Sequence, residues 1–383
     1  GLCELSRAFH HHNIKVFVDY NPWDTGTRRE GRDDLDALAL LVQAIEADGI
    51  FLDTMSRGAA EFRDRLDTVR PGVVFEGEGA LTLENLHDHH LSWAQWFEDS
   101  EVPGVLRNKW FERRHLQHQI KRWEHDHSGE LHCAWMNGSG MMVWENVFGS
   151  WVGWNARDRS ILRAMLPIQR RYAGLFSGEN WTPLVLTLAP EIYASMWESE
   201  GLRLWTLVNR SAQAYEGPLL HIDPAGEGRI YDLIQGFEAR VESKEGKTIV
   251  SGAIGPRGIG CFIAGESAAL GADFGAFLQS QAELAARADF DTAFPSRETR
   301  RVAVVKTTPV ATVPEDMVAI PAAELTLEVV FRVRECGFYE SSSQPLAGGN
   351  LHKPVAFQRP VKLERFAIDL TPVTNAQYAE FLR

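Results

Sequence analysis

The segment Asp48–Glu78, DGIFLDTMSRGAAEFRDRLDTVRPGVVFEGE, contains two short apolar strands with a helical stretch between them. Each strand ends in a carboxylate: IFLD ends at Asp53 and VVFE ends at Glu76. Where parallel strands alternate with helices, the carboxyl ends of the strands form the mouth in which catalytic groups lie. The segment therefore predicts an α/β fold with Asp53 and Glu76 as candidate catalytic residues.

The alternation of strands and helices also precedes this segment. The β-branched and aromatic run IKVFVDY (14–20) predicts a buried strand. A stripe of apolar residues at helical spacing predicts a helix after that strand, with Gly49 as its end. The stripe consists of Leu35, Leu38, Val42 and Ile45.

Further elements are predicted downstream of Glu78. They are a strand VPGVLRNKW (102–110), a helix with the stripe Leu116, Ile120 and Trp123, the apolar runs LHCAWM (131–136) and GMMVWE (140–145), and a long helix over 157–176 bent by Pro167. A repeat of roughly 30 residues is typical of a strand–helix–strand unit. The pattern favours a (β/α)8 TIM-type barrel, whose first strands we expect to lie before Gly1.

From about Gly178 onward, the sequence predicts strands separated by turns instead of alternating strands and helices. The strand candidates are IYASMWES (192–199), LRLWTLVNR (202–210), PLLHID (218–223), FEARVES (237–243), KTIVSGAIG (247–255) and GIGCFIAG (258–265). Glu200-Gly201 predicts a hairpin turn, so this region is expected to be an antiparallel β-sandwich. The predicted boundaries are a barrel at 1–178, a sandwich at 179–268, a helical and extended linker at 269–312 and a third region at 313–383.

The composition and charge of the chain indicate the number of domains and argue against some classes of binding partner. The chain has 383 residues, 44% of them hydrophobic, which suits two or three domains with sizeable cores. Its formal net charge is −13, and no cluster of Lys and Arg marks a nucleic-acid or membrane surface. No apolar run reaches the roughly 18 residues that span a bilayer. The four cysteines lie far apart and predict free thiols, so localisation stays open.

A resemblance follows from several phrases along the first 268 residues. They are FVDYNPWD (17–24), GIFLDTM (49–55), VVFEGEG (73–79), MMVWENVFGSWVGW (141–154), LRLWTLVNR (202–210) and RGIGCFIAG (257–265). Together they resemble the glycoside hydrolases that have a (β/α)8 catalytic barrel followed by a β-sandwich. The resemblance implies a carbohydrate partner and hydrolysis of a glycosidic bond without a cofactor.

Glycoside hydrolysis requires one carboxyl group to protonate the leaving oxygen and a second to attack the anomeric carbon or activate water. Asp53 as nucleophile and Glu76 as acid/base on the next strand resembles the layout of α-amylase-like hydrolases. We expect only one of Glu76 and Glu78, which flank Gly77, to face the mouth, and Glu76 is favoured because it directly continues the apolar run. The alternative for Asp53 is to cap the next helix through backbone amides.

Two loops supply candidate substrate-binding residues. The first contains Asp19, Asn21, Trp23 and Asp24, which could bind hydroxyls and stack on a sugar ring, or simply anchor a solvated loop. The second contains Trp144, Glu145 and Asn146, with Trp151 and Trp154 nearby. Glu145 replaces Glu76 as the candidate acid if Glu76 is structural, and Glu78 is kept as a binding residue. For any single Trp, core packing is the competing interpretation.

Two histidine clusters raise the question of a metal, HDHH (87–90) and HDHSGELHC (125–133). Neither has a zinc-ligand spacing, so surface or loop histidines are the favoured interpretation. We therefore expect no metal in the barrel.

The C-terminal region carries a second resemblance. MVAIP (317–321) and VKLERFAIDLTPVTNAQYAEFLR (361–383) resemble the opening of the formylglycine-generating, SUMF1-type sulfatase-modifying enzymes. The matching residues are Phe366, Ile368, Asp369, Pro372, Val373, Thr374, Asn375, Tyr378 and Phe381.

This second resemblance is incomplete. The usual Gly-Gly is replaced by Ala322-Ala323, the active-site cysteines of that family are absent, and Cys336 matches none of them. Copper is therefore expected only for a complete module, and a sulfatase is expected as a partner only through it. The alternative function is a non-catalytic glycan-binding or scaffold barrel fused to such an oxidase. A role in a sulfated-glycan pathway is suggested by association alone.

Overall fold

The computed structural model describes residues 1–22, 31–79, 81–94, 99–121, 125–144, 146–147, 150–151, 153–223, 228–244, 246–294, 302–303, 309, 311–332 and 354–382. The chain divides into two compact units. Unit 1 comprises Gly1–Glu145 and Val152–Pro295, and unit 2 comprises Asn146–Trp151 and Ser296–Arg383.

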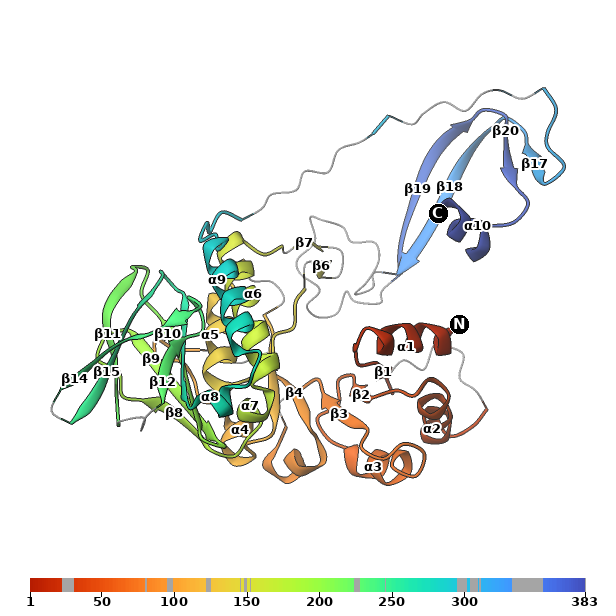
Figure 1. The fold of residues 1–383 in the computed structure, drawn as a ribbon. Helices are drawn as coiled ribbons and strands as arrows, with labels where there is room; N and C mark the ends of the chain where they lie inside the picture. Colours follow the sequence, from red (N-terminus) through yellow and green to blue (C-terminus); the bar gives the residue numbers. More distant parts are fainter. Residues whose placement is uncertain are drawn as a thin grey trace. The chain divides into compact units, whose positions relative to one another are not determined.

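Unit 1 begins with a parallel five-stranded sheet of order β1-β2-β3-β4-β5 (Figure 1). Its strands are β1 (Phe17–Tyr20), β2 (Gly49–Leu52), β3 (Val74–Gly77), β4 (Leu91–Ala94) and β5 (Leu116–Gln119). All four neighbouring pairs are parallel, which confirms the predicted α/β arrangement. Closure of these strands into a barrel stays a prediction.

One face of this sheet packs on helices. The helices before β3 are α1 (Leu2–His11), α2 (Asp34–Ile45) and α3 (Ala59–Leu66). The Asp33 side chain caps α2 by accepting from the Leu35 N–H, and the predicted stripe of α2 packs in one core with Ile50 and Phe75 of the sheet. The helix ends at Glu46, which has a left-handed φ of 56°, rather than at Gly49, which is the first residue of β2.

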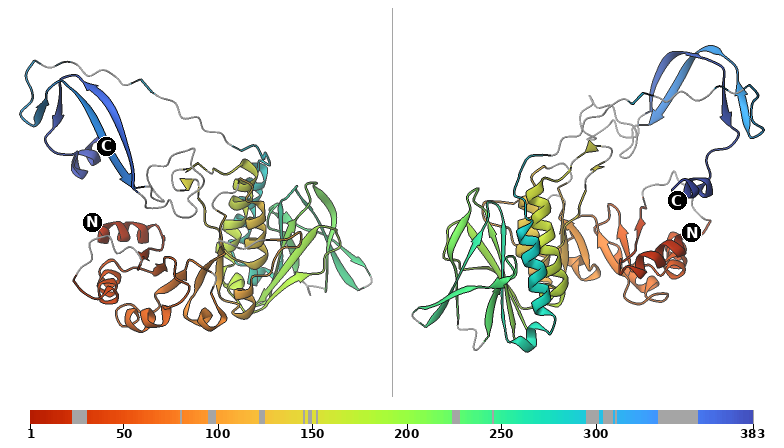
Figure 2. Two further views of the ribbon diagram at one scale, coloured as in Figure 1. Left: turned by 180° about the vertical axis from the view of Figure 1, so that it is seen from behind. Right: turned by 45° about the horizontal axis from the view of Figure 1, so that its top comes forward.

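The predictions for residues 102–136 are wrong in three places. The segment around Leu116 forms strand β5 instead of a helix, and the expected strand at 102–110 contains the short helix α4 (Arg107–Phe111). The run LHCAWM lies in helix α5 (Ser128–Asn137), between β5 and the sandwich strand β10 (Leu202–Asn209) (Figure 2). Because α5 is buried on nearly all sides, it lacks the polar stripe that distinguishes a helix from a buried strand.

The run GMMVWE continues the sheet for one position. Gln119 and Met141 form a parallel bridge, in which the Met142 N–H donates to the Gln119 carbonyl at 3.0 Å. Helix α5 is thus the crossover between β5 and the next strand position. Upstream of it, a 3-10 helix, η1 (Leu83–Asp88), connects β3 to β4.

The predicted antiparallel sandwich is present in the rest of unit 1. One sheet has the order β13-β12-β16-β10-β9-β8 and the other β11-β15-β14. Besides β10, its strands are β8 (Trp181–Val185), β9 (Ile192–Ser199), β11 (Tyr215–Ile222), β12 (Arg229–Asp232), β13 (Phe237–Glu238), β14 (Arg240–Lys244), β15 (Lys247–Ile254) and β16 (Ile259–Gly265). The β9–β10 turn has positive φ at Glu200 and Gly201, as a type I′ hairpin requires.

Four helices complete unit 1: α6 (Ala156–Arg171), which contains Pro167, α7 (Ala173–Phe176), α8 (Ser267–Leu270) and α9 (Phe274–Ala286). Helix α9 lies in the segment expected to be a linker, yet it packs beside α6 (Figures 1 and 2). The fully buried Gln281 donates to the carbonyls of Ala164 and Leu233. This helix is therefore part of the core of unit 1.

The described part of unit 2 contains antiparallel strand pairs and a helix. Strand β17 (Met317–Ile320) pairs with β20 (Phe366–Asp369), and β18 (Ala323–Arg332) pairs with β19 (Pro354–Leu363). Strands β6 (Asn146–Val147) and β7 (Ser150–Trp151) form another pair, and Thr374 and Gln377 build a capping box at the start of α10 (Asn375–Phe381). Among the helices that the structure describes, none is long and apolar enough to cross a membrane.

Candidate functional site

The strand register places polar side chains on the face of the parallel sheet opposite α2 and α3. Asp19, Phe51 and Glu76 are aligned across β1, β2 and β3, and Trp93 is aligned with His118 across β4 and β5. Residues two positions apart in a strand share a face, which adds the residues that follow each strand. We call this surface the carboxylate face; it consists of Asp19, Asn21, Phe51, Asp53, Glu76, Glu78, Trp93 and His118.

Glu76 is the buried carboxylate of this face, with 8% of its surface exposed. Its Oε1 accepts a hydrogen bond from the Trp93 indole N–H at 3.0 Å and lies 2.6 Å from Nδ1 of His118. The Trp93 ring stacks on Phe51 with centroids 4.6 Å apart. Among the described residues, Oε2 of Glu76 has no hydrogen-bond partner, so this oxygen is the one available to a ligand.

The His118 ring is fixed by its neighbours. A Cβ atom added at Gly140 would lie 2.7 Å from Cδ2 of the His118 ring, closer than carbon atoms approach each other. Only glycine fits beside the ring at this position. Sequence reasoning missed His118, because its place beside Glu76 depends on the register of two strands that are not adjacent in the chain.

Asp53 lies just after β2, on the strand next to Glu76. Its Oδ2 accepts a hydrogen bond from Nδ2 of Asn21 at 2.8 Å. Helix α3 begins at Ala59, with Gly58 as an N-cap that makes no side-chain hydrogen bond. The alternative in which Asp53 caps the following helix stays a prediction.

The expectation that only one of Glu76 and Glu78 faces the mouth is wrong, because residues i and i+2 of a strand point the same way. Glu78 accepts a hydrogen bond from the N–H of Thr54 at 2.7 Å, and Thr54 has a left-handed φ of 58°. Asp19 is exposed to solvent, but nearby protein atoms partly desolvate its carboxylate. This desolvation and the negative charge of Glu78 raise the pKa of Asp19.

The second group of predicted binding residues is only partly described. Trp23, Asp24 and Glu145 lie outside the described residues, as does the side chain of Asn146, whose backbone belongs to β6 in unit 2. Trp144 is half-buried. Trp154 is a core residue that stacks on His127 with centroids 4.3 Å apart, in line with the packing interpretation.

The histidines do not assemble a metal site in the described part of the chain, where three or more potential ligands converge nowhere. Burial lowers the pKa of both His89 and His115 to about 4, and Nε2 of His115 lies 2.8 Å from the Ser92 hydroxyl. Cys3, Cys133 and Cys261 are free, as predicted, whereas Cys336 is outside the described residues. Burial raises the pKa of the Cys133 and Cys261 thiols, which makes them unreactive.

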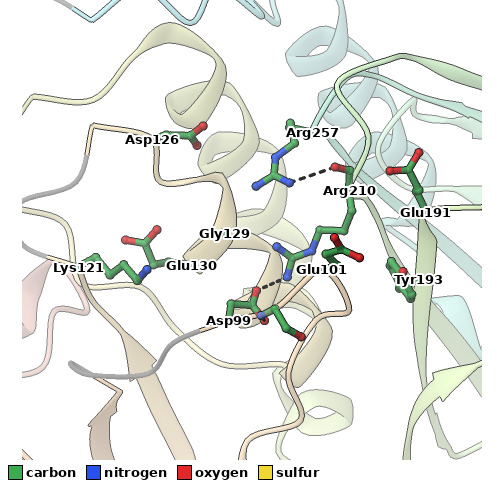
Figure 3. A pocket seen from close by; sticks show the side chains of 11 residues that line it. Asp99, Glu101, Lys121, Asp126, Gly129, Glu130, Glu191, Tyr193, Arg210 and Arg257 are labelled. Carbon is green, nitrogen blue, oxygen red and sulfur yellow. Dashed lines mark hydrogen bonds and ion pairs between the residues drawn. The ribbon is translucent and has the colours of Figure 1, made fainter.

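A cavity of about 510 Å³ lies at the same carboxyl-terminal edge of the sheet (Figure 3). Part of its wall follows β4, at 99–101, and part follows β5, from Lys121 to the first turn of α5. Sandwich residues close the other side, including Arg210 and Arg257, whose side chains extend between the two parts of the wall in Figure 3. Sequence reasoning singled out none of these residues as a site, because they come from segments far apart in the chain.

No family model and no curated protein matches the chain. The resemblance of the C-terminal region to sulfatase-modifying enzymes therefore finds no support in these comparisons.

Solved structures that resemble the chain include glycoside hydrolases. An α-amylase from Anoxybacillus is 12% identical with a TM-score of 0.49, over 70% of this chain and 79% of the amylase. An α-amylase from Geobacillus thermoleovorans in complex with acarbose is 10% identical with a TM-score of 0.49, over 70% and 80%. A debranching enzyme from Nostoc punctiforme is 13% identical with a TM-score of 0.46, over 69% and 78%. At these values the likeness assigns no family, and the chemistry follows from the residues of the site.

Proposed function

We propose that this chain is a glycoside hydrolase-like protein that acts on a carbohydrate through Glu76 and Asp53. The observation that supports this most directly is the setting of Glu76, a buried carboxylate on the carboxylate face. Trp93 and His118 hold one of its oxygens, which leaves the other toward a ligand. A buried, oriented carboxyl group with one oxygen available is what general acid/base catalysis requires.

The second carboxylate lies at a suitable separation. Phe51 is aligned with Glu76, so Asp53 is one strand across and two residues further along. With strands about 4.8 Å apart and a rise of about 3.3 Å per residue, the two Cα atoms are about 8 Å from each other. Side chains on one face at this spacing can approach a glycosidic oxygen and an anomeric carbon from different sides.

In this proposal, Glu76 protonates the leaving oxygen through Oε2 and Asp53 attacks the anomeric carbon or activates water. Asn21 orients Asp53, and the Phe51–Trp93 pair offers an aromatic surface beside Glu76. Asp19 lies on the same face, where its carboxylate oxygens can accept hydrogen bonds from sugar hydroxyl groups.

The test is hydrolysis of a panel of aryl glycosides by the wild-type chain and by E76Q and D53N. The exposed Asp64 on α3 provides a matched control, D64N, which changes a carboxylate to an amide away from the carboxylate face. We expect turnover to fall at least about 100-fold in E76Q and D53N and to be unchanged in D64N.

Wild-type turnover in either site variant would refute the assignment. A wild-type chain that binds glycans without hydrolysing any of them would instead support the alternative of a non-catalytic glycan-binding barrel.

A further inference from the structure

The cavity beside α5 has two arginines at its floor. The Arg210 side chain is only 7% exposed and pairs with Asp99, and its buried Nε atom has no hydrogen-bond partner among the described residues. Arg257 donates through Nε to the Ser128 hydroxyl at 3.1 Å and through Nη1 to the Arg210 carbonyl at 3.0 Å. These contacts, two of them drawn in Figure 3, fix Arg257 against the start of α5 and Arg210 against Asp99.

The acidic residues of the wall divide into two groups. Three of them already have partners: Asp99 pairs with Arg210, Glu130 lies 3.1 Å from Nδ1 of His127, and Asp126, whose side chain is 60% exposed, pairs with Arg157 at 2.6 Å. Glu101 and Glu191 are solvent-exposed. Arg257 and Lys121 are thus lining cations that form no ion pair with a carboxylate among the described residues, while the exposed rim is acidic.

Further hydrogen-bond donors line the same cavity. The N–H of Ser128 is taken by Asp126, but the N–H groups of Gly129 and Glu130 in the first turn of α5 meet no acceptor in the described part of the chain. A Cβ added at Gly129 would meet no atom of the described residues within 4 Å, so the cavity is open toward them at this point. Lys121 lines the wall and has no partner among the described residues. The N-terminus of α5 and the cationic side chains thus both favour an anion in this cavity.

The electrostatics agree with this geometry. Burial and the positive charges of Arg210 and Arg157 lower the pKa of Arg257, although Asp126 and Asp99 oppose them. The lowered pKa means that burial, together with the neighbouring arginines, disfavours the charged form of this guanidinium group. An anion at the floor would compensate that charge.

We propose that this cavity binds an oxyanion, a carboxylate or a sulfate, carried by a hydroxylated ligand such as an acidic sugar. The oxyanion accepts hydrogen bonds from Arg257, Lys121 and the first turn of α5. Glu101, Glu191 and Tyr193 at the other side accept hydrogen bonds from hydroxyl groups. A volume of about 510 Å³ is within the range of small-ligand sites.

The cavity and the carboxylate face lie at one edge of the sheet, so an acidic glycan is the substrate class that would use both. That link rests on the proposed function, whereas binding at the cavity does not.

The experiment is calorimetric titration of the full chain with methyl glucuronide, glucose 6-sulfate and the neutral methyl glucoside. Two variants at Gly129 form a matched pair: G129D places a carboxylate in the cavity, and G129N places an uncharged side chain of the same size there. Aspartate is favourable in the first turn of a helix, so G129D is expected to fold. The variant K121Q is a second test, because it removes the positive charge of a side chain that has no partner among the described residues.

We expect both acidic sugars to bind, the neutral sugar to bind at least about tenfold more weakly, and G129D to weaken acid binding at least about tenfold. G129N should weaken acid binding less than threefold. K121Q should weaken the binding of the acidic sugars but not that of the neutral sugar. A difference between the two acids identifies which oxyanion the site prefers.

Equal affinity for the acidic and neutral sugars, equal effects of G129D and G129N, or no saturable binding would overturn the proposal. Hydrolysis of neutral aryl glycosides is measured separately. Acid binding without any hydrolysis would leave this inference standing and refute the proposed function, and hydrolysis without acid binding would do the reverse.

Discussion

Nδ1 of His118 lies 2.6 Å from Oε1 of Glu76, although the two residues are 42 positions apart in the chain. The contact joins β5 to β3 across β4, which supplies Trp93 as the second partner of the same oxygen. Two ring nitrogens on one carboxylate oxygen restrict the rotation of the Glu76 side chain and direct the other oxygen away from them. His118 is therefore a positioning residue for Glu76.

Replacement of His118 separates this positioning role from simple packing. In H118N the amide nitrogen occupies nearly the place of Nδ1 and still donates to Glu76, whereas H118A has no donor. We expect kcat/KM for a cleaved aryl glycoside to fall about 10- to 100-fold in H118A and much less in H118N. Steady-state kinetics on both variants checks this. Equal losses in the two variants would show that the ring is needed only for its volume.

Gly140 is predicted to act through His118. In G140A the new methyl group would meet the His118 ring at 2.7 Å, so the ring must move away from Glu76. We expect a loss of about 1–3 kcal/mol in the free energy of unfolding, together with lower kcat/KM. The double variant H118A/G140A removes the clash, so G140A should cost much less in that background. Chemical denaturation of the four proteins in the cycle measures this coupling, and additive losses would contradict it.

Asp232 gives the sandwich a defined pH dependence. Burial raises the pKa of Asp232 to about 6 from an ordinary 3.8, although its Oδ1 accepts hydrogen bonds from the N–H groups of Ile234 and Gln235. Between these two values the folded chain binds more protons than the unfolded chain. Stability therefore falls as pH rises from about 4 to about 6, by about 3 kcal/mol from this group.

The variant D232N keeps the acceptor oxygen and removes the charge. It should be more stable than the wild type at pH 7 and nearly equal to it at pH 4. Urea denaturation at the two pH values tests this, with D223N at an exposed neighbouring position as the control. A pH-independent difference between D232N and wild type would contradict the assignment.

The parts of the fold that could be predicted from sequence are the elements that bury one apolar face and expose the other, or that contain a characteristic turn. The strands that carry Asp53 and Glu76 were predicted because each contains an apolar run that packs on α2 and α3, and the turn at Glu200-Gly201 because it needs two positive φ angles. Strand β5 was missed because its buried side chains are not apolar. Its residues LQHQ carry polar side chains, and two of them, Gln117 and Gln119, are buried. Hydrophobic periodicity cannot detect such a strand.

The candidate sites depend even more on tertiary structure. His118 becomes relevant only when β5 is aligned with β4, and Arg257 only when the sandwich packs on the first turn of α5. Neither residue belongs to a motif with a fixed spacing. Sequence reasoning could propose the two carboxylates but could not find the groups that position them.

Helix α9 is predicted to be essential to unit 1, although its sequence suggested a linker. Gln281 on α9 is fully buried and donates to the carbonyls of Ala164 on α6 and Leu233 of the sandwich, at 3.1 and 3.0 Å. In Q281L both carbonyls lose this donor inside the core, which should lower the free energy of unfolding by about 2–4 kcal/mol. Gln279 is exposed on the same helix, so Q279L introduces the same side chain at a cost below about 0.5 kcal/mol. Urea denaturation compares the two variants, and equal stabilities would show that α9 is only loosely attached and that the chain up to 268 forms the independent body expected from its sequence.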